Sequence, residues 1–133
     1  MEEYVDPIRE IAKHANNNGI ITCLETILTG EKLLNLLDMI DRPYVKAVYD
    51  TGNRVAFGHD LAADIRLLGE RIFHVHIKDK DKKNSNVLLG TGLVNFEEVF
   101  YALRDIQYDG PFTFETTRGS SPLNTATYNI NFD

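Results

Sequence analysis

The sequence has few of the features that mark membrane, secreted or nucleic-acid-binding proteins. Its single cysteine, Cys23, excludes an intrachain disulfide and a cysteine-rich zinc module. No apolar run approaches the ~20 residues that cross a bilayer, and the first ten residues lack the basic and then apolar pattern of a signal peptide. Acidic residues outnumber basic ones by 20 to 14, and the net charge of −6 disfavours a nucleic-acid partner. We therefore expect a cytoplasmic protein that binds neither membranes nor nucleic acids.

Hydrophobic residues are numerous enough for one core: they make up 43% of the 133 residues, so we expect one domain over residues 1–133. Helical spacing and capping residues predict helices that begin at Asp6-Pro7, after Thr29, at Leu61 and after Asn95. Short segments rich in β-branched and aromatic residues predict strands at 19–25, 45–50, 71–79 and 111–115. Residues 51–53 are typical of a turn, and residues 79–94 form an unusually long polar connection.

The order of these elements is a helix, then a strand and a helix three times, then a last strand. Such alternation is typical of a parallel sheet with crossover helices, in which functional groups gather at the carboxyl ends of the strands. The last strongly polar residues of the four predicted strands are Glu25, Asp50, His76 and Glu115. We therefore expect these four side chains at one end of the sheet.

Side chains alternate across a strand, which tests whether the four residues share a face. Counting back from each gives one face with Ile21, Cys23, Glu25, Lys46, Val48, Asp50, His74, His76, Thr113 and Glu115. The opposite face is largely aliphatic or aromatic and carries Thr22, Leu24, Ala47, Tyr49, Phe73, Val75, Ile77, Phe112 and Phe114. Helices would cover this second face, so the first is expected to point inward. The helix after Asn95 is expected to turn Phe96, Val99, Phe100 and Leu103 toward the core.

Three carboxylates at one rim would repel one another and raise each other's pKa unless a cation neutralised them. Oxygen-rich ligation with one imidazole suits Mn²⁺ or Mg²⁺, and Co²⁺ or Zn²⁺ is also compatible. The alternative is that acids stand at strand ends only because loops begin there. The matched parity of all four residues favours a metal site.

Six motifs then carry a resemblance to a known family. They are LET around Glu25, YDTGN around Asp50, GHD, HVHIKD around His76, LGTGLVNFEEVF, and YDGPFTFET around Glu115. From about residue 5 to residue 119 the chain resembles the carboxyl-terminal half of the sugar-phosphate isomerase/epimerase superfamily. These proteins are xylose-isomerase-like (β/α)₈ TIM barrels and include ketose 3-epimerases, L-xylulose-5-phosphate 3-epimerase and inosose dehydratase.

The resemblance implies a function for the strand-end residues. It implies that Glu25, Asp50, His76 and Glu115 bind one divalent metal, and that Glu25 and Glu115 exchange protons with the carbon beside a sugar's carbonyl. A metal on the carbonyl and neighbouring hydroxyl oxygens stabilises the enediolate, and two acids on opposite faces permit epimerisation. The hypothesis is therefore a metal-dependent isomerase or epimerase of a sugar or sugar phosphate. Alternatives are a polyol dehydratase, an endonuclease IV-like nuclease, which the acidic charge and few histidines disfavour, and an inactive binding module.

Four further residues are candidate substrate contacts. Asn53 stands where some relatives of this family have a histidine, and it could bond a sugar hydroxyl or simply form a turn. His59 either begins a helix or lines the rim of the site. Lys82 belongs to a cluster with Lys78, Lys80 and Lys83 that could engage a phosphate or be part of a solvated loop, and Arg118 could contact an anion.

Of the two histidines in HVHIKD, His76 is the expected ligand because it lies nearest the strand end. His74 lies one pleat deeper, where a hydrogen-bonded core histidine is the preferred interpretation over a partner of the metal ligands.

A complete barrel of this type takes roughly 250 residues and eight strands, whereas four strands are predicted here. The fold class is thus α/β, a TIM-barrel half of four parallel strands with crossover helices. Three explanations stay open: a piece of a longer chain, the product of a split gene, and a half-barrel that associates. Two copies about a twofold axis could close eight strands in a homodimer.

Overall fold

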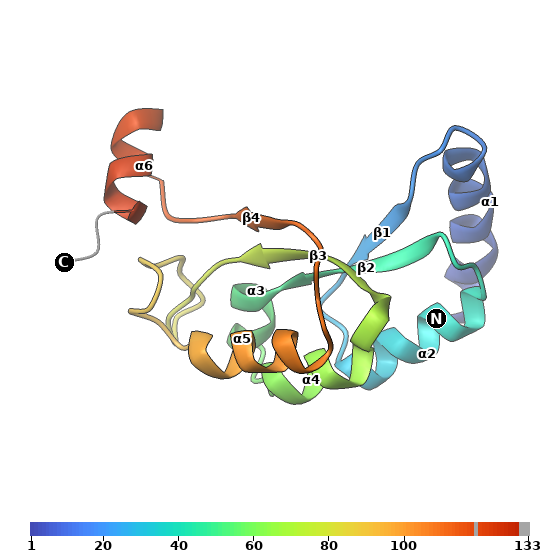
Figure 1. Ribbon diagram of the computed structural model, residues 1–133, viewed down its shortest axis with the longest axis horizontal. Helices are drawn as coiled ribbons and strands as arrows, with labels where there is room; N and C mark the ends of the chain where they lie inside the picture. The colour runs from blue at the N-terminus through green and yellow to red at the C-terminus, as the bar shows by residue number, and fades with distance from the viewer. Residues whose placement is uncertain (119, 131–133) are drawn as a thin grey trace.

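Four parallel strands form a single sheet in the order β1-β2-β3-β4, which confirms the predicted half-barrel arrangement (Figure 1). The computed structural model describes residues 1–118 and 120–130. Its elements in chain order are η1 (Glu2–Tyr4), α1 (Val5–Asn16), β1 (Thr22–Glu25), α2 (Gly30–Ile40), β2 (Val45–Asp50), α3 (Thr51–Ala56), α4 (Leu61–Leu68), η2 (Gly69–Arg71), β3 (Ile72–Ile77), α5 (Phe96–Asp105), β4 (Phe112–Phe114) and α6 (Pro122–Ile130).

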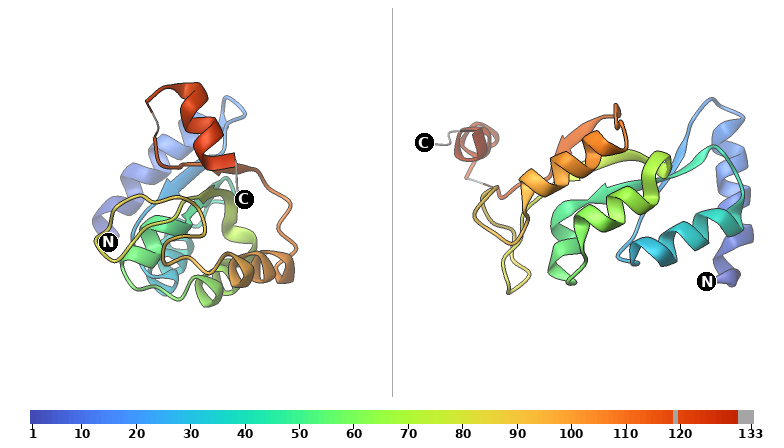
Figure 2. Two further views of the ribbon diagram at one scale, coloured as in Figure 1. Left: turned by 90° about the vertical axis from the view of Figure 1, so that its left-hand side faces the viewer. Right: turned by 60° about the horizontal axis from the view of Figure 1, so that its bottom comes forward.

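Three helices lie side by side on one face of the sheet. Figures 1 and 2 show α2, α4 and α5 along one face, with α1 at the amino ends of the strands and α6 beyond their carboxyl ends. This is the layering of a barrel wall, with helices outside and the opposite face turned toward the barrel axis. Among residues 1–118 and 120–130, no helix has the length and apolar character needed to span a membrane.

Side-chain caps explain where several helices begin. Thr29 accepts a hydrogen bond from the backbone N–H of Lys32 at the start of α2, and Asn95 accepts one from Glu98 at the start of α5, as predicted. At α1 the prediction was wrong: Tyr4 holds the cap position, and Asp6 lies inside the first turn. Because η1 leads directly into α1, the chain is already helical before Asp6.

The predicted turn at residues 51–53 was also wrong, since these residues open helix α3. The cause is Asp50, whose Oδ1 accepts a hydrogen bond of 2.6 Å from the backbone N–H of Asn53. This is an N-cap bond, and it stabilises a helical first turn. Asp50 thus ends β2 and begins α3 at the same point.

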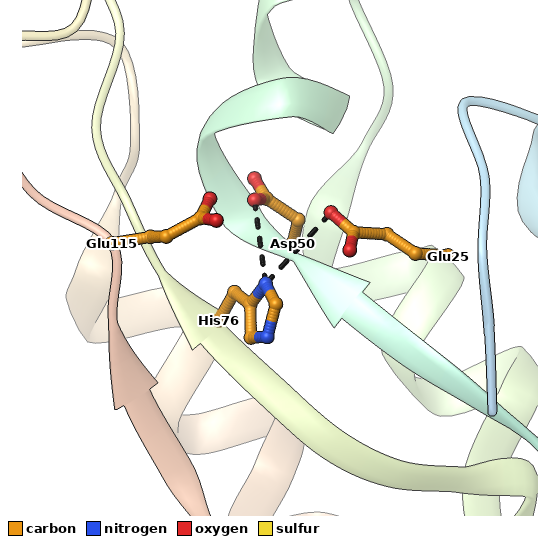
Figure 3. A group of neighbouring side chains, drawn as sticks. All are labelled: Glu25, Asp50, His76 and Glu115. Atoms are coloured by element: carbon orange, nitrogen blue, oxygen red, sulfur yellow. Dashed lines mark ion pairs between the residues drawn. The ribbon is translucent and has the colours of Figure 1, made fainter.

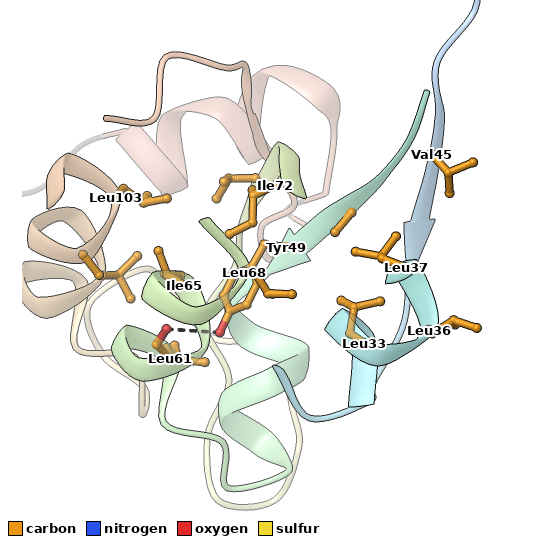
Figure 4. Close-up of a cluster of buried hydrophobic side chains, with 14 of the residues drawn as sticks. Leu33, Leu36, Leu37, Val45, Tyr49, Leu61, Ile65, Leu68, Ile72 and Leu103 are labelled. Atoms are coloured by element: carbon orange, nitrogen blue, oxygen red, sulfur yellow. Dashed lines mark hydrogen bonds between the residues drawn. The ribbon is translucent and has the colours of Figure 1, made fainter. Parts of the chain in front are cut away.

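The core fills the space between the sheet and the helices (Figure 4). Ala47 and Tyr49 of β2 and Val75 of β3 are fully buried on the helix-facing side, as parity predicted. The Tyr49 hydroxyl donates a 3.3 Å hydrogen bond to the carbonyl of Leu61, which satisfies its polar end inside the core. The helices contribute Leu33, Leu37, Ile40, Leu61, Ile65, Leu68, Val99, Ala102 and Leu103.

Three aromatic residues predicted to be covered are instead exposed at the β4 edge. Phe112 and Phe114 lie on the edge strand, and Phe100 of α5 contacts Phe112 with ring centroids 6.1 Å apart. Each of these three residues is at least 45% exposed to solvent. An edge strand has a neighbour on one side only, so its outward residues lack the helix that a further strand would bring.

Phe73 was also predicted to face the helices, and the sheet register explains why it does not. Ala47 pairs with Ile72, whereas Val48 pairs with His74, so Phe73 is an extra residue in a bulge. Ile72 therefore takes the buried place and Phe73 is exposed. The bulge leaves the parity of His74 and His76 unchanged.

A buried arginine ties the start of α2 to α3 and α4. Arg54 is fully buried, and its Nη1 donates to the carbonyl of Leu28 at 2.7 Å and to Asp64 Oδ2 at 3.2 Å. Its guanidinium also lies 4.6 Å from the ring centroid of Tyr49. Asp64 in turn accepts a hydrogen bond from the backbone N–H of Gly30. Nothing in the sequence pattern had singled out Arg54.

Candidate metal centre

The four predicted strand-end residues converge at one point of the sheet (Figure 3). Glu25 and Asp50 are the last residues of β1 and β2, His76 is the last but one of β3, and Glu115 directly follows β4. One potential ligand atom from each of the four lies within 4.8 Å of the others. This confirms the predicted convergence, while the ligand role of the four residues stays a prediction.

The group has a buried floor and an open mouth. The side chain of Asp50 is 2% exposed and that of His76 16%, whereas those of Glu25 and Glu115 are 43% and 46% exposed. His76 Nδ1 lies 3.8 Å from Glu25 Oε1 and 3.9 Å from Asp50 Oδ2. A small molecule can therefore reach the two glutamates, while Asp50 is held inside.

Two atoms at the floor of the group fit a bound cation. His76 Nδ1 and Asp50 Oδ2 are both buried and make no hydrogen bond among the described residues, and the only cation beside Asp50 Oδ2 there is the ammonium of Lys78, at 3.3 Å. Such atoms are costly when left unsatisfied, at about 1–3 kcal/mol each. Both are lone-pair donors aimed at the same group, and a carboxylate-rich set with one imidazole suits a hard or borderline divalent metal. The residues present therefore fit a metal.

The orientation of Asp50 follows from its place at the start of α3. Because Oδ1 is engaged as the helix cap, Oδ2 is the oxygen left to face His76. A carboxylate fixed by a backbone hydrogen bond is preorganised for coordination. The same bond thus shapes the local fold and aims the candidate ligand.

Lys78 also belongs to this site, although sequence reasoning placed it only in a lysine cluster. Its Nζ lies 3.3 Å from Asp50 Oδ2 and forms an ion pair with Glu115 Oε2. Burial disfavours the charged ammonium, but the bond to Glu115 and the charge of Asp50 outweigh burial and raise the pKa of Lys78. The bond from Lys78, partly opposed by burial, lowers the pKa of Glu115. Parity could have found Lys78, because it stands two residues beyond His76.

His74 has a hydrogen-bond partner of its own. Its Nε2 lies 2.7 Å from Thr113 Oγ1 on β4, and its ring packs edge-on against that of His76 with centroids 5.1 Å apart. The hydrogen bond of His74 was predicted, but the residue is half-buried and does not belong to the core. The edge-on contact between the two rings helps to fix the orientation of the His76 ring.

Asp79 organises the long connection after β3, another role that sequence reasoning missed. Its carboxylate is buried and accepts four backbone hydrogen bonds, from Lys80 and Val94 at Oδ1 and from Gly90 and Gly92 at Oδ2. These bonds draw both ends of residues 80–94 to one point beside the strand tip. No local pattern reveals this, because the donors lie up to 15 residues away.

The four candidate substrate contacts differ in position. Asn53 and Glu25 line the same surface hollow of about 510 Å³. His59 lines a separate hollow on the helix side, where its Nδ1 lies 3.3 Å from Asp64 Oδ2, and Asp60 rather than His59 caps α4. Lys82 and Arg118 are exposed and stand outside the group of four.

Comparison with known proteins agrees with this architecture. The family described as a xylose isomerase-like TIM barrel matches residues 1–132. L-ribulose 3-epimerase from Methylomonas sp. is 32% identical over 120 residues, covering 84% of this chain and 41% of that protein. Inosose dehydratase from Clostridium perfringens is 27% identical over 122 residues, covering 78% of this chain and 41% of the relative.

Solved structures are similar over almost the whole chain. The crystal structure of a xylose isomerase domain protein from Planctomyces limnophilus superposes with a TM-score of 0.81 at 26% identity, covering 92% of this chain and 48% of that one. The chain thus spans less than half the length of these relatives.

Proposed function

Because the chain belongs to the xylose isomerase-like TIM-barrel family, we propose that it carries the metal centre and the two proton-transferring glutamates of a ketose 3-epimerase or related sugar isomerase. The observation that carries this proposal is the convergence of Glu25, Asp50, His76 and Glu115, with the buried His76 Nδ1 left without a hydrogen-bond partner among the described residues. Similarity to L-ribulose 3-epimerase supports the same reaction class.

In this proposal the four residues hold one divalent cation. Mn²⁺ or Mg²⁺ fits three carboxylates and an imidazole best, and Co²⁺ or Zn²⁺ is the alternative. When bound, the cation supplies electrostatic stabilisation of the negative charge that develops on the substrate's carbonyl oxygen. Asp50 and His76, whose side chains are 2% and 16% exposed, hold and orient the cation, and the more exposed glutamates exchange the protons.

Glu25 and Glu115 are the acid–base pair. They come from β1 and β4, the two edges of the sheet, and therefore approach the shared point from opposite sides (Figure 3). One carboxylate oxygen accepts the proton from the carbon beside the carbonyl, and the other carboxylic acid delivers a proton to the opposite face of the enediolate. The configuration of the sugar decides which glutamate acts as base.

The substrate class is a sugar or sugar phosphate. Asn53 shares the hollow beside Glu25, where its amide could bond a sugar hydroxyl. Lys82 and Arg118 carry exposed positive charges that a phosphate would require, and they are the proposed anion contacts. His59 is paired with Asp64, so its proposed role shifts from direct contact to support of the α3–α4 connection.

A complete site also needs the other half of the barrel. β1 and β4 are open edges, and the described residues supply four of the eight strands that this fold uses. A second copy of the chain could supply the remaining strands, and so could an amino-terminal half, either on the same polypeptide or on a separate one. Activity is proposed for that assembled form.

Deuterium exchange tests the reaction. The protein is incubated with Mn²⁺ and a panel of ketoses in D₂O, and the sugars are followed by NMR and mass spectrometry. Epimerisation places deuterium on the carbon beside the carbonyl. The second candidate is a dehydratase, which similarity to inosose dehydratase favours, and it would give a product lighter by one water.

Matched variants assign the roles. Glu25→Gln and Glu115→Gln should each abolish epimerisation, the variant that lacks the base should also lose exchange, and both should leave the far-UV circular dichroism unchanged. Glu10→Gln, on the exposed surface of α1, should exchange like the wild type. Undiminished epimerisation in either site variant would overturn the assigned acid–base pair, and absence of exchange and of dehydration in the wild type would overturn the enzymatic proposal.

A further inference from the structure

Two residues that are not candidate ligands, Thr51 and Gly52, hold Lys78 beside the group of Glu25, Asp50, His76 and Glu115. The hydroxyl of Thr51, a fully buried residue, donates a 2.6 Å hydrogen bond to the carbonyl of Lys78 and accepts one of 3.0 Å from its N–H. Gly52 leaves room for the side chain, because a Cβ there would lie 2.5 Å from Lys78 Cγ. The Thr-Gly pair after Asp50 therefore fits the backbone and stem of this lysine.

The charged end of Lys78 meets two of the four candidate ligands. Its ammonium pairs with Glu115 and lies 3.3 Å from Asp50 Oδ2, the same oxygen that faces His76. The side chains of Lys78 and Asp50 are 12% and 2% exposed, so water screens their contact weakly, whereas Glu115 is 46% exposed. A divalent cation drawn to Asp50 and Glu115 would meet this ammonium at the same carboxylates, and like charges repel.

We propose that Lys78 is an internal counter-cation of this centre, which pairs with Asp50 and Glu115 in the metal-free protein and competes with the metal for them. The inference rests on the metal centre proposed above. Thr51 and Gly52 fix only the backbone and the first part of the stem, so the remaining methylene groups can carry the ammonium away when a metal binds. The lysine thereby prevents three carboxylates from facing one another unneutralised and lowers the affinity of the site for metal.

This role predicts opposite effects on metal affinity and on metal-free stability. Removing the ammonium removes a competitor, so the metal should bind more tightly. The same change leaves the carboxylates without a cation, so the metal-free protein should become less stable. A merely structural lysine would not behave in this way, because disturbing the strand end would weaken metal binding.

The test uses Lys78→Met, which keeps most of the stem and removes the charge. Lys83→Met is the control, because Lys83 is exposed in the loop and undergoes the same change of charge. Calorimetric titration with Mn²⁺ measures affinity, and thermal unfolding followed by circular dichroism, without and with Mn²⁺, measures stability. Lys78→Met should bind Mn²⁺ at least about tenfold more tightly, equivalent to about 1.4 kcal/mol. Its metal-free melting temperature should fall, and saturating Mn²⁺ should restore it.

The outcomes separate the two proposals. If the wild type binds Mn²⁺ and folded Lys78→Met binds it equally or more weakly, the counter-cation role is overturned while the metal centre stands. If neither the wild type nor Lys78→Met binds Mn²⁺, both proposals fail. If Lys83→Met tightens binding as much as Lys78→Met, general charge explains the effect and the specific role is overturned.

Discussion

Replacement of Asp79 by asparagine should destabilise the protein far more than its small change in shape suggests. The Asp79 carboxylate accepts two backbone hydrogen bonds at each oxygen, from Lys80, Gly90, Gly92 and Val94. An amide keeps one oxygen and places an NH₂ group where the other stood. That NH₂ cannot accept, so two of the N–H groups lose their partner.

The magnitude follows from the bonds that are lost. Hydrogen bonds to a charged group contribute about 1.5–3 kcal/mol each, so two lost bonds give at least about 3 kcal/mol. In urea, small proteins have m values of about 1–3 kcal/mol/M, so the unfolding midpoint should fall by at least about 1 M. This is a large share of a typical stability of about 5–15 kcal/mol.

Urea unfolding followed by far-UV circular dichroism measures this difference, and Asp81→Asn is the matched control in the same loop. Asp81 accepts backbone hydrogen bonds from Lys83 and Ser85 at the single oxygen Oδ1, which asparagine keeps. Its midpoint should therefore stay close to that of the wild type. Equal midpoints for Asp79→Asn and Asp81→Asn would refute the reasoning from four converging bonds.

Three further predictions concern stability, pH and assembly. Arg54→Met should lower the free energy of unfolding by about 3 kcal/mol, because it removes the buried cation from Asp64, whose side chain is only 14% exposed, and the donor from the carbonyl of Leu28. Arg66→Met, which breaks an exposed pair, should cost less than about 1 kcal/mol in the same urea assay. The hydrogen bond from Arg66, with the charges of Arg66 and Arg104, holds the pKa of Asp105 below its ordinary value of 3.8. The ionised Asp105 therefore stabilises the protein above pH 3.8, and this stabilisation is lost as the pH falls through the folded-state pKa. The difference in melting temperature between the wild type and Asp105→Asn should accordingly disappear in acid. A difference that does not depend on pH would contradict this assignment. Light scattering coupled to size exclusion should give twice the chain mass of 15.1 kDa if two copies close the barrel, and a stable monomer would exclude that pairing.

Much of the fold could be predicted because its signals are local. The strand at residues 45–50 has the predicted bounds, and Thr29 and Asn95 cap helices as their positions indicated. Parity along each strand was enough to bring Glu25 and Asp50 to the same face as His76 and Glu115. These features depend on neighbours in sequence, which a single chain displays directly.

Features that depend on distant partners could not be predicted. The bulge at Phe73 arises from the register between β2 and β3. The exposure of Phe112 and Phe114 follows from β4 being an edge. Arg54 directly follows the residues interpreted as a turn, and its burial depends on contacts with Leu28 and with Asp64 of α4.

Within the candidate site, the position of Lys78 could have been predicted from the sequence but was missed. Continuing the alternation beyond His76 places Lys78 on the same inward face. The neighbouring lysines instead suggested a solvated basic loop, and that grouping by charge hid the geometric relation. The role of Asp79 had no such signal, because its donors lie across a long connection.

The central claim is that Glu25, Asp50, His76 and Glu115 surround one divalent cation. X-ray data from crystals soaked in Mn²⁺, recorded where manganese scatters anomalously, test it most directly. A single strong anomalous peak within coordination distance of all four side chains is the predicted result. Crystals that remain without a peak there at saturating Mn²⁺, or that carry manganese only at other surface acids, would contradict the account.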